Sequence, residues 1–182
     1  MLDFSKNYFA LFDLPERFEL DTADLAERYR ELQRVVHPDR YANASEQERR
    51  LAVQGASHIN AAFETLKQPL ARARYMLSLH GIDLNAQQES TSDAMFLMEQ
   101  MELRETLAEA RAKDDPYAVI DQVMDRLGVQ RKALIDAFPA QFEDAGEASL
   151  EAVRESVRKL QFLEKLRSEA EKVEAELEDE GI

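Results

Sequence analysis

His37, Pro38 and Asp39 stand together in a chain that has only three histidines and five prolines. An imidazole beside a carboxylate could serve a small hydrolase as a general base, but the sequence places no third catalytic group near them. In a plainer interpretation, Pro38 stops a helix and Asp39 caps nearby backbone. The hydrolase is the weaker alternative, and the segments on either side must decide what the tripeptide does.

The segment before the tripeptide predicts an amphipathic helix. Asp21 or Thr22 can begin it, because both side chains accept hydrogen bonds from the free amides of a first turn. The proline disfavours helical geometry at His37, so the helix should end there. Arg30 and Arg34 lie opposite the apolar stripe and form an exposed basic face. The stripe consists of Leu25, Tyr29, Leu32 and Val36.

The segment after the tripeptide predicts a second helix. Ser45 and Glu48 have the spacing of a capping box, in which each side chain binds the backbone amide of the other residue. An apolar stripe follows at Leu51, Ala52, Ala56, Ile59, Phe63 and Leu66. The two helices should therefore pack antiparallel, with the tripeptide in their connecting turn. Pro69 is well placed to begin a further helix that Gly81 can close.

Composition excludes several classes of function. The 182 residues include no cysteine, so disulfides, thiolate metal sites and cysteine nucleophiles are excluded. The formal net charge of −14 is uneven: residues 1–80 hold 12 acidic and 11 basic residues, whereas residues 81–182 hold 25 and 12. An acidic second half repels phosphates and anionic lipids, so we expect no nucleic acid or membrane partner. We also expect a cytoplasmic protein, because no leader peptide or apolar run of about 18 residues is found.

The change in charge coincides with a polar segment at residues 82–92, where we place a domain boundary. We predict an all-α chain with an N-terminal domain at 1–82, a linker at 83–92 and an antiparallel three-helix bundle at 93–182. In the bundle, the second helix opens at Asp115 and Pro116, with a possible pause at Gly128. The third starts near Ser149.

The first bundle helix has two apolar faces. Phe96, Leu103, Leu107 and Ala110 form a core stripe at helical spacing. A second stripe of Leu97, Met98 and Met101 lies beside Glu102, Glu105 and Glu109. A bundle helix needs one apolar stripe, so the second either packs on another part of the chain or forms a partner surface.

The helical hairpin around the tripeptide resembles the J-domain of DnaJ-type co-chaperones. More of the chain resembles the HscB family, the J-proteins of iron–sulfur cluster assembly. The resemblance rests on "YFALFDLP", "LQRVVHPDR", "YMLSLHGIDL", "FLMEQMELRETL" and "VRKLQFLEKLR", in this order from Tyr8 to Arg167. The sequence departs from the family pattern at Asp13, where glycine is usual, and at Arg40, where lysine is usual.

The resemblance implies a co-chaperone that is not an enzyme and uses no cofactor. Its J-domain would stimulate HscA, a specialised DnaK-type ATPase chaperone, and its C-terminal domain would deliver the iron–sulfur scaffold protein IscU to HscA, supporting the maturation of iron–sulfur proteins. The three histidines lack the local spacing of metal ligands, so we expect no metal site. We expect a monomer. The alternatives are a J-protein for a different client and a helical assembly protein that is not a chaperone.

The resemblance also implies two sets of binding residues. The chaperone-binding set is His37, Pro38, Asp39, Arg28, Arg30, Arg34 and Arg40. The scaffold-binding set is Leu97, Met98, Met101, Glu102, Glu105, Glu109 and Phe162. In the first set, the histidine and the aspartate would present a donor and an acceptor to the chaperone, and the arginines would add electrostatic complementarity.

Overall fold

The computed structural model describes residues 6–41, 44–84, 91–143 and 146–180, without the side chains of Pro38 and Asp39. All regular structure in these residues is helical, which confirms the predicted fold class. The chain divides into two compact units, Met1–His80 and Gly81–Ile182. Each unit has its own buried core, so each can carry a binding surface independently.

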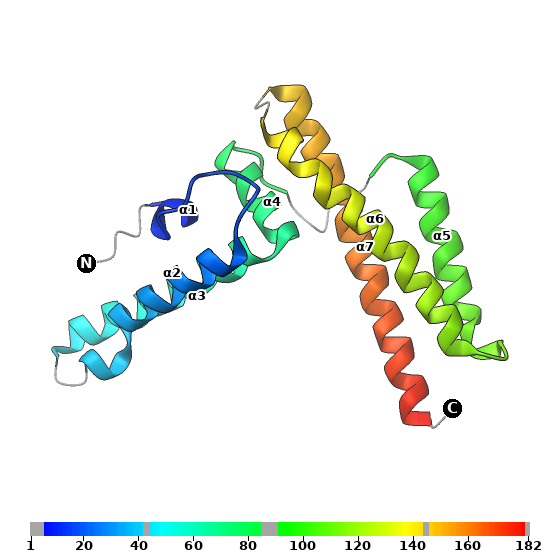
Figure 1. Ribbon diagram of the computed structural model, residues 1–182, viewed down its shortest axis with the longest axis horizontal. Coiled ribbons are helices and arrows are strands. Elements are labelled where there is room, and N and C mark those ends of the chain that lie inside the picture. The colour runs from blue at the N-terminus through cyan, green and yellow to red at the C-terminus, as the bar shows by residue number, and fades with distance from the viewer. Residues whose placement is uncertain (1–5, 42–43, 85–90, 144–145, 181–182) are drawn as a thin grey trace. The chain divides into compact units, whose positions relative to one another are not determined.

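The first unit is built on a helical hairpin. Helix α2 (Thr22–Val36) and helix α3 (Glu46–Lys67) lie side by side, and the short 3-10 helix η1 (Pro38–Tyr41) follows α2 (Figure 1). Asp21 caps α2 with hydrogen bonds from two first-turn amides, and Ser45 and Glu48 form the complete capping box. Both predicted helix starts are confirmed, because these side chains satisfy amides that have no partner within the helix.

Two shorter helices complete the first unit. Helix α1 (Tyr8–Leu11) meets helix α4 (Pro69–Leu79), where the Tyr8 amide donates to the Tyr75 hydroxyl at 2.8 Å and the two rings stack. Pro69 begins α4 as predicted, and Gly81 follows its end with a φ of 78°. The core of this unit is made by Phe9, Phe12, Phe18, Leu25, Ile59, Leu66, Ala73 and Leu77.

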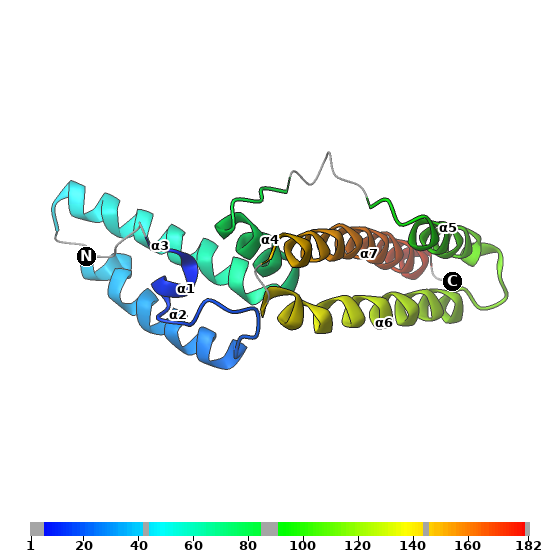
Figure 2. The ribbon, with the colours of Figure 1, turned by 90° about the horizontal axis from the view of Figure 1, so that it is seen from above.

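The second unit is a three-helix bundle. Helix α6 (Pro116–Glu143) and helix α7 (Glu147–Glu180) run alongside each other, and helix α5 (Ala94–Glu109) contacts both (Figure 2). The predicted α5 core stripe is buried at Leu103, Leu107 and Ala110, whereas Phe96 is half-buried. Most of the remaining core comes from Ile120, Val123, Leu127, Phe138, Val153, Val157, Leu160, Leu163 and Leu166.

The structure also defines the helix limits within the bundle. Gly128 does not interrupt α6; burial of its neighbour Leu127 offsets the roughly 1 kcal/mol that a helical glycine costs. Helix α5 ends at Glu109 and is followed directly by the 3-10 helix η2 (Ala110–Ala112). Helix α7 begins at Glu147, about half a turn before Ser149.

The predicted linker lies mostly outside the described residues, since 85–90 are not described. At its two ends, Leu84 and Thr91 are buried. No helix in the described part of the chain is long and apolar enough to cross a membrane.

Candidate functional site

His37 lies at the end of α2, where the chain leaves the helix. Its backbone has a φ of −57° and a ψ of 131°, which breaks the helical geometry as expected before a proline. The histidine is exposed, and its carbonyl accepts a hydrogen bond from the Arg40 amide at 3.0 Å. The predicted side-chain roles of Pro38 and Asp39 lie outside the described residues.

Two residues of η1 cap the end of α2. In an uninterrupted helix, the Arg34 carbonyl would accept from the amide of residue 38, but proline has no N–H. The Arg40 guanidinium donates to this carbonyl at 3.2 Å instead, and the Tyr41 hydroxyl donates to the Val35 carbonyl at 3.3 Å. These contacts tie the turn to the helix that carries the basic face.

The predicted arginines of α2 fall into two groups. Arg30 and Arg34 are exposed and form no ion pair within the described residues, so their charges can face a partner. Arg28 is engaged within the first unit: its guanidinium donates to Asp24 at 2.9 Å and to the carbonyls of Phe12 and Asp13 at 3.0 and 2.9 Å. The hydrogen bond to Asp24 is the main reason that the pKa of Arg28 is raised.

Arg28 also contacts Asp13, a position at which the sequence departs from the family pattern. Asp13 has a φ of 53°, in the left-handed region that favours glycine and that aspartate can also enter. Arg28 binds the carbonyl of this residue and lies 3.6 Å from its carboxylate. Arg28 therefore has a structural task that the sequence did not reveal.

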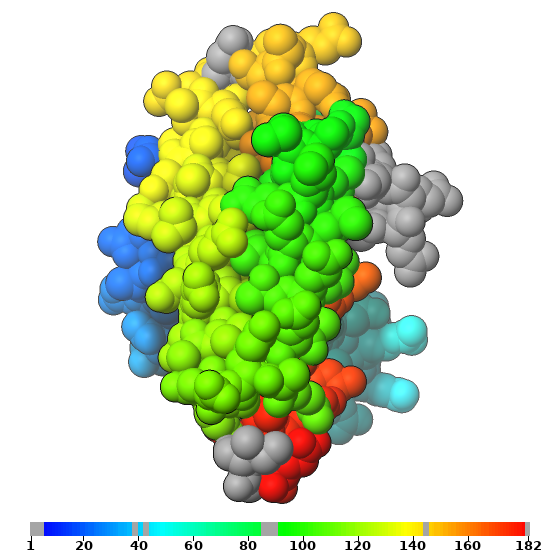
Figure 3. All heavy atoms as spheres, turned by 90° about the vertical axis from the view of Figure 1, so that its right-hand side faces the viewer, coloured from blue at the N-terminus to red at the C-terminus, as the bar shows by residue number. Residues whose placement is uncertain are grey.

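The outer face of α5 exposes methionines among carboxylates. Met98 and Met101 have exposed fractions of 58% and 61%, and Glu102 and Glu105 are exposed beside them. Glu109 is also exposed and pairs with Lys113 at 3.0 Å. Figure 3 views the bundle from the side on which α5, in green, is presented to solvent. The second apolar stripe thus remains largely uncovered in the described structure.

The two remaining residues of the predicted scaffold set are Leu97 of α5 and Phe162 of α7. Both are half-buried, and the Phe162 ring meets the Phe96 ring edge-on at 6.4 Å between centroids. Phe162 therefore lies at the α5–α7 contact and is still partly accessible. All seven residues of the predicted scaffold set are at least partly exposed, which a binding surface requires.

A polar cluster that sequence reasoning missed fixes the start of α5. Asp93 caps the helix by accepting from the Phe96 amide at 3.0 Å and binds the Lys159 ammonium of α7 at 2.6 Å. The hydrogen bond from Lys159, followed by that from the Phe96 amide, lowers the pKa of Asp93. Thr91 adds a hydrogen bond to Glu155. The only sequence signal for this cluster is the type of Asp93, which suits a helix start.

The described residues contain no group of three or more histidine, aspartate or glutamate side chains arranged to hold a metal ion. Two exposed surfaces therefore stand out in the described residues, a basic one at the end of α2 and an acidic, methionine-rich one on α5.

The chain is similar to known proteins over most of its length. A family model described as the HSCB C-terminal oligomerisation domain matches residues 92–171. A co-chaperone protein HscB homolog from Shewanella loihica is 52% identical over 169 residues, covering 92% of this chain and 97% of the relative.

Solved structures are similar over nearly the same range. The chaperone HscB from Vibrio cholerae has a TM-score of 0.83 and 43% identity, covering 94% of this chain and 99% of its own. The human co-chaperone protein HscB also has a TM-score of 0.83, with 31% identity and coverage of 93% and 82%. By this identity and coverage, the chain belongs to the HscB family of co-chaperones.

Proposed function

We propose that this protein stimulates the ATPase of the DnaK-type chaperone HscA and delivers the iron–sulfur scaffold protein IscU to it. The first unit docks on HscA through the end of α2, and the second unit holds IscU on the outer face of α5. The chain itself supplies no catalytic group; it acts by binding two proteins at once.

The geometry of the first unit supports docking through charge and a fixed turn. His37 is exposed beside a turn that Arg40 and Tyr41 tie to α2, so its position is defined before a partner binds. A preorganised contact loses less entropy on binding than a mobile one. Arg30 and Arg34 supply positive charge on the same helix, which favours an acidic surface on the chaperone.

The bundle supports a different kind of contact. Met98 and Met101 offer adaptable apolar surface, and nearby carboxylates favour a partner that carries basic residues. The observation that carries the proposal is the exposure of these two methionines on a unit whose core is closed without them. Exposed clustered methionines have no packing role in the described structure and are explained by a partner.

The test is a steady-state ATPase assay of HscA with this protein, with IscU and with both. We expect stimulation by this protein alone and greater stimulation when IscU is added. Stimulation of HscA that IscU does not change would favour a J-protein for a different client. No stimulation of any DnaK-type chaperone would favour a helical assembly protein.

A further inference from the structure

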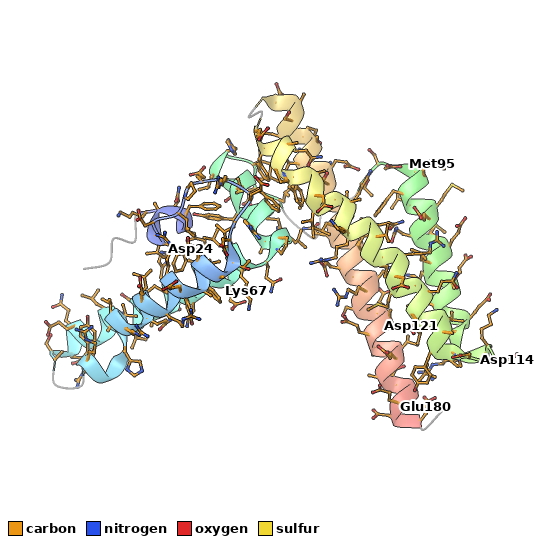
Figure 4. The ribbon with its side chains drawn as sticks, viewed as in Figure 1. Asp24, Lys67, Met95, Asp114, Asp121 and Glu180 are labelled. Carbon is orange, nitrogen blue, oxygen red and sulfur yellow. The ribbon has the colours of Figure 1, made fainter. Side chains whose placement is uncertain are left out.

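A groove runs between α5 and α6, beside the methionine face, and Lys159 of α7 also lines it. Its volume is about 570 Å³, and its apolar lining comes from Met95, Phe96, Met98, Ala133 and Leu134. Met95 is 76% exposed and lies at the N-terminal end of α5 (Figure 4). A groove of this size can hold one or two large apolar side chains.

Two exposed apolar side chains of the bundle, Met95 and Met98, line this groove. Among the described residues of the second unit, four large hydrophobic side chains are exposed: Met95, Met98, Met101 and Val129. Three belong to α5, and Val129 of α6 lines an adjoining hollow with Glu99 and Arg126. Glu99 and Arg126 line both hollows, so the two hollows adjoin at this ion pair.

The charges around the groove favour a basic partner. Its two cations are already paired, Arg126 with Glu99 at 3.1 Å and Lys159 with Asp93 at 2.6 Å. Glu102 lines the groove and forms no ion pair within the described residues, so a negative charge remains at its edge. In a partner with an apolar side chain next to a lysine or arginine, the apolar side chain would fill the groove and the cation would pair with the Glu102 carboxylate.

We propose that the α5–α6 groove receives an apolar side chain of IscU that lies next to a basic residue. This inference rests on the proposed function, because Met98 and Glu102 belong to both the scaffold-binding set and the groove. It extends the scaffold interface from the α5–α7 side to α6 and adds Met95, Ala133 and Leu134 to it.

The groove can be blocked from an exposed position. Ala133→Tyr places a ring at the groove on the solvent side of α6, where Ala133 is exposed. Ala118→Tyr is the matched control, since Ala118 is an exposed alanine of the same helix and lies about 22 Å farther along the axis. We expect Ala133→Tyr to weaken IscU binding at least tenfold, measured by calorimetric titration, and Ala118→Tyr to leave it unchanged.

Four further results separate the possible failures. Melting temperatures of the two variants should agree, because both carry the same exposed substitution. If Ala133→Tyr binds IscU as tightly as the parent protein while Met101→Ala binds it more weakly, the groove proposal is wrong and the proposed function stands. No IscU binding by the parent protein would overturn both. Sedimentation tests a second copy of the chain as the occupant. If the parent self-associates, and Ala133→Tyr alone is monomeric and binds IscU with unchanged affinity, then the groove holds a second copy and our proposal is wrong.

Discussion

The end of α2 and the outer face of α5 differ in charge and in the kind of side chain they expose. The α2 surface presents Arg30 and Arg34 beside a turn that the Arg40 and Tyr41 side chains hold to the helix. The α5 surface presents Met98 and Met101 among carboxylates. Charged surfaces chiefly speed association and select partners, whereas clustered apolar side chains hold a complex together. The two surfaces therefore suit a fast, transient contact and a longer-lived one.

Removal of the His37 imidazole tests the α2 surface with the largest expected effect. In His37→Gln, stimulation of HscA should fall to nearly the unstimulated rate, because we propose that the exposed imidazole contacts the chaperone. The circular dichroism spectrum and melting temperature should match those of the parent. If the folded variant stimulates HscA as well as the parent does, the His37 side chain is not needed for docking.

Truncation of the exposed methionines tests the α5 surface. Met98→Ala with Met101→Ala should weaken IscU binding by about tenfold or more, since hot-spot losses of about 2 kcal/mol each are typical. Stimulation of HscA without IscU should persist, because we propose that HscA contacts the first unit.

Val53→Ala is a matched control for the methionine pair, because Val53 is 60% exposed and lies in the first unit. It should leave IscU binding unchanged. A collapse of the melting temperature in the methionine pair would instead mean that these side chains are part of the core.

Two arginines of α2, Arg34 and Arg28, allow a docking role and a structural role to be compared within a single helix. Arg34→Glu should slow association with HscA by about tenfold at low salt, and the difference should shrink as the Debye length falls to about 8 Å at physiological ionic strength. Arg28→Gln should instead lower the melting temperature, because it removes a guanidinium that binds Asp24 and two carbonyls. If both variants changed only the association rate, Arg28 would belong to the docking surface after all.

These assignments show which features could be predicted from the sequence. Asp21, Ser45 and Pro69 marked helix starts correctly, because capping depends on side chains a few residues apart. The role of Arg28 was missed because its partners at Phe12 and Asp13 are distant in sequence. The groove was missed for the same reason: its two walls are helices whose facing sides no local pattern specifies. The binding roles of both residue sets remain predictions.

The smallest expected effect is at the start of α5. Interaction with Lys159 lowers the pKa of Asp93, so this carboxylate stabilises the bundle above its ordinary value near 3.8 and loses that contribution as the pH falls through the lowered value. In Asp93→Asn, the amide oxygen still caps the helix but carries no charge. Between about pH 5 and pH 3, the parent's melting temperature should therefore fall more steeply than the variant's. Parallel curves would show that the ion pair adds no stability.

The central claim is that one chain must bind both proteins at once. The most direct measurement is the HscA ATPase rate with IscU and an equimolar mixture of His37→Gln and Met98→Ala/Met101→Ala. Each variant retains one intact surface, so the mixture contains both surfaces on separate chains. We predict that the mixture shows the stimulation given by the methionine variant alone, without the additional increase that IscU brings to the parent protein. A mixture that reproduces the full parental rate would contradict the account, because the two surfaces would then act without being joined.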